Sequence, residues 1–119
     1  MQMPSVTLIY DVDCPGADAA RDNLRVALHE AGLPVSWREV CRSVDAPVTD
    51  GAHVGSPTVL VNGTDVAPGP SPTGWSCRTY VDDDGVRSRA PSAARISASL
   101  KAALSASLKA SFKAALQAL

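Results

Sequence analysis

The first third of the chain combines two short apolar runs with one segment of helical spacing. Residues 6–12, VTLIYDV, are almost continuously apolar and predict a strand buried on both faces. In residues 15–31 apolar side chains recur every three or four positions, which predicts an amphipathic helix. Gly32 and Pro34 end that helix, and residues 35–41, VSWREVC, predict a second strand. This order indicates a right-handed crossover between parallel strands.

Turn signals dominate the middle of the chain. Residues 42–56 have no clear apolar period and leave room for a short helix at most. Residues 57–66, PTVLVNGTDV, predict a hairpin around an Asn-Gly pair, which favours a type I′ turn. Residues 67–76 hold three prolines and two glycines and predict a loop, whereas residues 77–81 predict either a short edge strand or a bend.

The last part of the chain differs in composition. It consists mainly of Ala, Ser, Leu and Lys, and residues 97–104, SASLKAAL, are followed at once by the near-repeat SASLKASF. Such a composition predicts one long helix. We therefore expect an α/β fold with two parts, a mixed-sheet core in residues 1–90 and an extended C-terminal helix in residues 91–119.

The apolar side chains of this last helix form a stripe that winds around it. Every fourth residue from Ile96 to Leu116 is Ile, Leu or Phe. Because a helix has 3.6 residues per turn, the stripe turns by about 40° per step, and by about 160° between Ile96 and Phe112. One flat sheet cannot cover it all. We expect the first half, to about Leu104, to pack on the core, and the second half to extend beyond it.

Size and composition suit one soluble domain, with 119 residues of which 45% are hydrophobic. The N-terminal residues lack the features of a secretory signal, and no apolar run is long enough to cross a membrane. We therefore expect a cytoplasmic protein. In that compartment its three cysteines are expected to carry out chemistry rather than form structural disulfides.

The net charge of −1 hides an uneven distribution. All twelve acidic residues lie at or before Asp84, whereas every lysine lies in the last twenty residues. An acidic body with a basic tail indicates association. For the end of the last helix we expect a second copy of the chain first, giving a homodimer, because an exposed Leu/Phe stripe needs an apolar mate. A membrane surface ranks second, nucleic acid is not expected, and a frayed extension without a role is the remaining alternative.

A cysteine stands where the first strand gives way to the first helix. Pro15 suits the first helical position, which would make Cys14 the N-cap, with its sulfur near unsatisfied backbone N–H groups. Those groups favour the nucleophilic thiolate, whereas the charges of Asp11 and Asp13 oppose it. We expect Cys14 to be reactive; a buried core cysteine is the alternative.

Two further cysteines can reach the same edge of the sheet. Cys41 ends the second strand and, in a parallel pair, emerges on the side of Cys14. Cys77 follows the Pro/Gly loop, whose Trp75 either lines a pocket or lies on the surface. For Cys41 the alternative is a core thiol, and for Cys77 a plain exposed one. The chain has no zinc-type cysteine spacing, phosphate-binding glycine loop or nucleophilic-serine motif, so we expect no cofactor.

This arrangement resembles the thioredoxin fold over roughly residues 5–104. Residues 14–17, CPGA, are similar to the redox motif of that family, and residues 55–58, GSPT, to the loop whose proline is cis. More narrowly, GSPTVLVNGTDV followed by SCRTY resembles small bacterial thioredoxin-like proteins, some of them labelled as relatives of alkylmercury lyases.

The resemblance implies a thioredoxin-like mixed sheet and a substrate-binding surface formed by Pro15, Ser56, Pro57, Thr58 and Trp75. The sequence departs from the family pattern in two ways. Alanine replaces the second cysteine of the motif, so no disulfide can form within it. The segment between the second predicted strand and Pro57 is also too short for a full second helix, so we expect a reduced one.

Three functions are consistent with these residues. In thiol–disulfide exchange with a protein or small-molecule substrate, Cys14 attacks and Cys41 or Cys77 resolves the mixed disulfide. In the second function the same three thiols capture a soft metal such as mercury. Cleavage of an organomercurial would also need a proton, which Asp11 or Asp13 could supply. The third is an interaction module that keeps the fold without catalysis.

Overall fold

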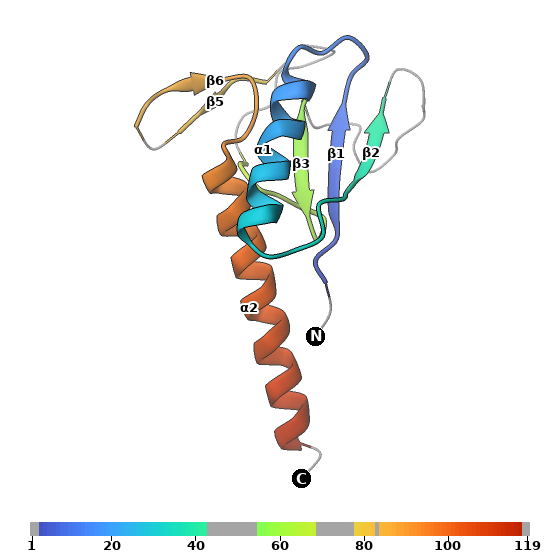
Figure 1. The fold of residues 1–119 in the computed structure, drawn as a ribbon, viewed down its shortest axis with the longest axis vertical. Helices are drawn as coiled ribbons and strands as arrows, with labels where there is room; N and C mark the ends of the chain where they lie inside the picture. The colour runs from blue at the N-terminus through green and yellow to red at the C-terminus, as the bar shows by residue number, and fades with distance from the viewer. Residues whose placement is uncertain (1–2, 43–54, 69–77, 83, 118–119) are drawn as a thin grey trace.

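The computed structural model describes residues 3–42, 55–68, 78–82 and 84–117. Six strands and two helices lie in these ranges (Figure 1). In chain order they are β1 (Val6–Tyr10), α1 (Gly16–Glu30), β2 (Arg38–Cys41), β3 (Thr58–Val61), β4 (Thr64–Asp65), β5 (Tyr80–Val81), β6 (Arg87–Ser88) and α2 (Ala93–Gln117).

Four strands form a mixed sheet in the order β2-β1-β3-β4. The central strand β1 runs parallel to β2 and antiparallel to β3, so that Leu8 lies between Glu39 and Val59. The mixed α/β architecture predicted from the sequence is therefore confirmed. The pair β5–β6 forms a separate antiparallel ribbon, of which only an edge strand was expected.

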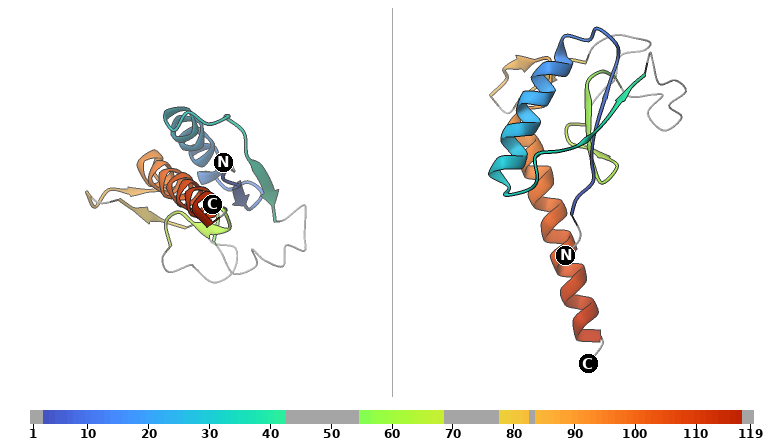
Figure 2. Two further views of the ribbon diagram at one scale, coloured as in Figure 1. Left: turned by 90° about the horizontal axis from the view of Figure 1, so that it is seen from below. Right: turned by 45° about the vertical axis from the view of Figure 1, so that its right-hand side comes forward.

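Both helices lie on the same side of the main sheet (Figure 2). The buried face of α1 follows the predicted spacing, with Ala20, Leu24, Ala27 and Leu28 turned inward. These side chains join one core with residues from the sheet and from α2, chiefly Leu8, Val59, Ile96 and Leu100. The reduced second helix would fall in residues 43–54, which lie outside the described residues.

Two strands are shorter than predicted. β1 ends at Tyr10 rather than at residue 12, because the chain turns at once. The Cys14 N–H donates to the Asp11 carbonyl at 3.1 Å, and Asp13 takes a left-handed φ of 61°. β2 begins at Arg38 rather than at residue 35, after a turn in which a serine N–H bonds back to a proline carbonyl.

An arginine on α1 fixes this helix over β2. The Arg21 guanidinium donates to both carboxylate oxygens of Glu39, at 2.9 and 3.0 Å, and lies 4.9 Å from the centre of the Tyr10 ring. The hydrogen bonds from Arg21 hold the pKa of Glu39 below its usual value. The pair thus sets the position of the start of α1 relative to the edge strand.

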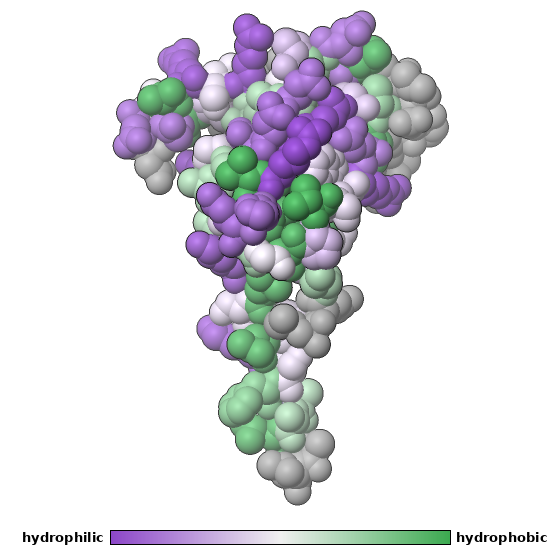
Figure 3. All heavy atoms as spheres, viewed as in Figure 1, coloured by the Kyte–Doolittle hydropathy of each residue, from purple (hydrophilic) through white to green (hydrophobic). Residues whose placement is uncertain are grey.

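The two halves of α2 have different surroundings. Its buried side chains lie between Ile96 and Leu100, and Leu104 is half-buried. Beyond them the helix projects from the body as a rod (Figure 1), and the side of the rod seen in Figure 3 is mostly apolar. Its exposed stripe consists of Leu108, Phe112 and Leu116, which are 61%, 66% and 54% exposed. Within the described ranges neither helix has the length and apolar character that a bilayer crossing requires.

Candidate functional site

One edge of the main sheet gathers most of the predicted site residues. The carboxyl ends of β1 and β2 share this edge because the strands are parallel, with Tyr10 opposite Cys41. The start of β3 lies there as well, because β3 runs antiparallel to β1. Helix α1 also begins at this edge (Figure 1). We call it the site edge.

Cys14 lies at the site edge, in the loop between β1 and α1, and is partly exposed. Its predicted N-cap role is wrong by one residue. The N-cap is Pro15, which already has helical dihedrals (φ −66°, ψ −21°) but offers no side-chain cap. The Ala17 N–H donates to the Cys14 carbonyl at 3.2 Å, so Cys14 still directly precedes the first helical turn. The helix dipole there favours negative charge.

Close packing joins the start of α1 to the loop before β3. A Cβ atom on Gly16 would lie 2.4 Å from the Arg89 carbonyl oxygen and 2.9 Å from Cδ of Pro57. No side chain fits in this gap, so only glycine permits the contact. The Ser56–Pro57 peptide is cis, as the resemblance implies. The segment that carries Cys14 is therefore held beside Pro57.

Replacement of Gly16 tests this packing, because the expected change in the free energy of unfolding is opposite in sign to that of an ordinary Gly→Ala substitution in a helix. Inside a helix, Gly→Ala normally stabilises by up to about 1 kcal/mol. Because the Arg89 backbone must move in Gly16→Ala, we expect a loss of about 1–3 kcal/mol in the free energy of unfolding, measured by urea denaturation. Gly16→Val should lose more. An alanine variant as stable as the parent would show that the two segments are not in tight contact.

Asp11 forms a buried ion pair behind the site edge. Its Oδ1 accepts from Nε of Arg42 at 2.7 Å, and the two side chains are 9% and 7% exposed. The Asp11 N–H donates to the Ser56 hydroxyl oxygen at 2.8 Å. Its second carboxylate oxygen, Oδ2, has no hydrogen-bond partner among the described residues. Asp11 thus connects β1, the residue after β2 and the loop before β3.

Several other predicted site residues are enclosed by the protein. Cys41 is buried, and no disulfide joins it to Cys14, the other cysteine among the described residues. Ser56 and Thr58 are fully buried, and the Thr58 hydroxyl donates to the Gly55 carbonyl at 2.7 Å. These two side chains therefore shape the loop from within. Two predicted residues are exposed, Asp13 and Pro15.

The soft-metal alternative depends on residues that the structure does not describe. Cys77 and Trp75 lie outside the described residues. In the part of the chain that is described, no group of three or more His, Cys, Asp or Glu side chains could hold a metal ion. A metal site that includes Cys14 and Cys41 therefore stays a prediction.

A buried arginine behind the site edge was not anticipated from the sequence. Arg78 is 4% exposed, and its guanidinium donates to the Thr58 hydroxyl oxygen, the Asp65 carboxylate and the Ala67 carbonyl at 2.9, 2.8 and 2.7 Å. Its backbone N–H donates to the Ser56 carbonyl at 2.7 Å. The sequence offers one weak signal for this role, an aspartate of opposite charge in the neighbouring hairpin.

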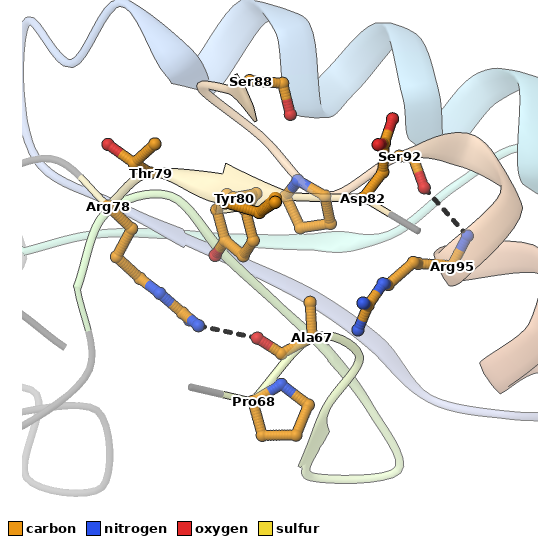
Figure 4. Close-up of a pocket in the computed structure, with 11 residues that line it drawn as sticks. Ala67, Pro68, Arg78, Thr79, Tyr80, Asp82, Ser88, Ser92 and Arg95 are labelled. Atoms are coloured by element: carbon orange, nitrogen blue, oxygen red, sulfur yellow. Dashed lines mark hydrogen bonds between the residues drawn. The ribbon is translucent and has the colours of Figure 1, made fainter. Parts of the chain in front are cut away.

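The Arg78 guanidinium also lies 4.6 Å from the centre of the Tyr80 ring. The Tyr80 hydroxyl donates to the Pro57 carbonyl, and burial raises the pKa of Tyr80 to about 12. Both residues line a cavity of about 220 Å³ between β5 and the start of α2 (Figure 4). None of the predicted site residues that the structure describes lines this cavity. Arg78 and Tyr80 are thus scaffold residues for the proline loop.

Comparison of the chain with protein-family models, curated proteins and solved structures gives no match.

Proposed function

We propose that the protein is a thioredoxin-like thiol protein that uses Cys14 in thiol–disulfide exchange. One observation carries the proposal: a partly exposed cysteine lies just before Pro15, the N-cap of α1, and the next residue of that segment, Gly16, packs closely against Pro57. The positive end of a helix favours thiolate over thiol, and thiolate is the attacking form. The substrate class is a disulfide or thiol of a protein or a small molecule.

In the proposed step the Cys14 thiolate attacks one sulfur of a substrate disulfide. A bond forms between Cys14 Sγ and that sulfur, the substrate S–S bond breaks, and the other sulfur leaves as a thiolate that takes a proton from water. A second thiolate then attacks the mixed disulfide and forms a new disulfide with the substrate sulfur. This second step returns Cys14 to the thiolate.

The second thiol, which resolves the mixed disulfide, must be one that can reach a substrate bound to Cys14. Ala17 stands where the family motif has its second cysteine, so the resolving thiol must come from elsewhere. Cys41 is only 9% exposed, so it cannot meet a bound substrate without movement of its surroundings. We therefore favour a small thiol from solution, with Cys77 as the alternative within the chain.

A mixed-disulfide assay tests the proposal. The reduced protein is mixed with oxidised glutathione, and adduct formation is followed by intact mass in the parent and in Cys14→Ser, Cys41→Ser and Cys77→Ser. Because thiol reactivity follows exposure, and Cys14 is partly exposed whereas Cys41 is buried, Cys14→Ser should slow adduct formation at least about 10-fold. The Cys41 variant is the matched control and should keep the parent rate.

The same variants separate the other functions. If the protein binds mercuric ion tightly, needs two of its cysteines to do so and forms no fast adduct at Cys14, the function is soft-metal capture rather than thiol–disulfide exchange. Equal, slow reaction at every cysteine with no metal binding would leave an interaction module.

A further inference from the structure

A groove runs along the line where the first half of α2 meets the body. The groove has a volume of about 630 Å³. One wall is an exposed row of alanines from α2, which we call the alanine row: Ala94, Ala98 and Ala102. The opposite side includes Val66, Asp82 and Asp84. Small side chains on a helix allow another helix to approach closely, with the partner's larger side chains between them.

The alanine row and the exposed stripe lie on nearly the same side of α2. Each steps by four residues, and Ala98 and Phe112 are only about 40° apart around the helix axis. Helix α2 therefore presents three small side chains in its first half and three large apolar side chains in its second half. Such a face is complementary to itself when one copy is reversed.

We propose that a second copy of this chain fills the groove, with the two α2 helices packed antiparallel about a two-fold axis near Ser105. The exposed stripe of each chain then lies on the alanine row of the other. The resulting pairs are Leu108 with Ala102, Phe112 with Ala98, and Leu116 with Ala94. In every pair the two residues are equally far from Ser105, so one register satisfies all of them in both directions.

One charged contact favours the same arrangement, although Lys101 and Lys109, each four residues from Ser105, set lysines of the two copies at the same level. Lys113 follows Arg95 by 18 residues, which is five full helical turns, so both project from the same side of α2. Arg95 lines the groove together with Asp82 and Asp84. In this antiparallel pair the two-fold axis is perpendicular to both helices. A side chain that projects to one side of the plane through the two helix axes projects to the same side in the second copy, so Lys113 of the second copy points toward Asp82 and Asp84. The second half of α2 contains no acidic residue that would oppose the approach.

The test is the mass of the full chain under reducing conditions, measured by sedimentation over a range of concentrations. We expect a reversible dimer. The double variant Leu108→Ser/Phe112→Ser should raise the dimer Kd about 100-fold or more, because four large apolar side chains leave the interface. Its matched control is Ala110→Ser/Ala114→Ser, which changes exposed residues on the opposite side of the rod and should keep the parent Kd.

A charge exchange tests the register. Lys113→Glu should weaken the dimer, and addition of Asp84→Lys in the same chain should restore it in part. The proposal is overturned by a chain that stays monomeric at every concentration, by a dimer that survives the stripe substitutions, or by a charge exchange without rescue. Binding of the monomer to anionic vesicles through the stripe would assign the surface to a membrane instead. None of these outcomes depends on the reactivity of Cys14.

Discussion

Arg78→Met should lower the free energy of unfolding by about 3–5 kcal/mol, because it removes a buried guanidinium that donates to three acceptors, one of them the partly buried Asp65 carboxylate. The substitution keeps the length of the side chain but removes the donors to Thr58, Asp65 and Ala67. Two of these acceptors are buried, and unsatisfied buried acceptors add their own desolvation penalty. Urea denaturation followed by circular dichroism measures the loss.

Arg87→Met is the matched control for this substitution. Arg87 lies on β6 and is exposed, so its replacement should change stability by no more than about 0.5 kcal/mol. If Arg78→Met proved equally mild, the loop before β3 and the β3–β4 hairpin would not depend on the guanidinium that joins them.

The second large effect is expected at the ion pair behind Cys14. Arg42→Met removes the donor at 2.7 Å from Asp11 and leaves a buried carboxylate whose other oxygen already lacks a described partner. We expect a loss of about 3–5 kcal/mol in urea denaturation. The Cys14 loop should loosen as well, because Asp11 accepts its closing hydrogen bond through the backbone.

A double-mutant cycle gives the control. Addition of Asp11→Asn to Arg42→Met removes the uncompensated charge, so the double variant should be more stable than the single Arg42→Met variant. Purely additive losses would mean that the two side chains do not depend on each other, despite the short distance between them.

The elements that depend on local pattern could be predicted from the sequence. The apolar spacing predicted the first and last residues of α1 to within one position each. The Asn62-Gly63 pair gave the hairpin turn, and both residues adopt the positive φ that a type I′ turn requires, 52° and 80°. The shared edge of β1 and β2 followed from the rule that a helical crossover joins parallel strands.

The buried charges could not be predicted, because burial depends on partners that lie far away in the sequence. Asp11 and Arg42 are separated by 31 positions, and Arg78 lies 20 positions after Thr58. A charged residue next to a turn is usually solvated, and no local pattern marks these as exceptions. Strand β6 was missed for a related reason, since a strand of two residues is too short to show alternation, whereas β5 falls within the edge strand or bend predicted at residues 77–81.

The near-repeat in α2 places one copy against the body and the other in solvent. Each repeat of eight residues adds about 12 Å of helix and turns its end by about 80°. Gain or loss of one repeat would therefore change both the reach of the rod and the direction in which its apolar side points, while the residues against the sheet keep their places.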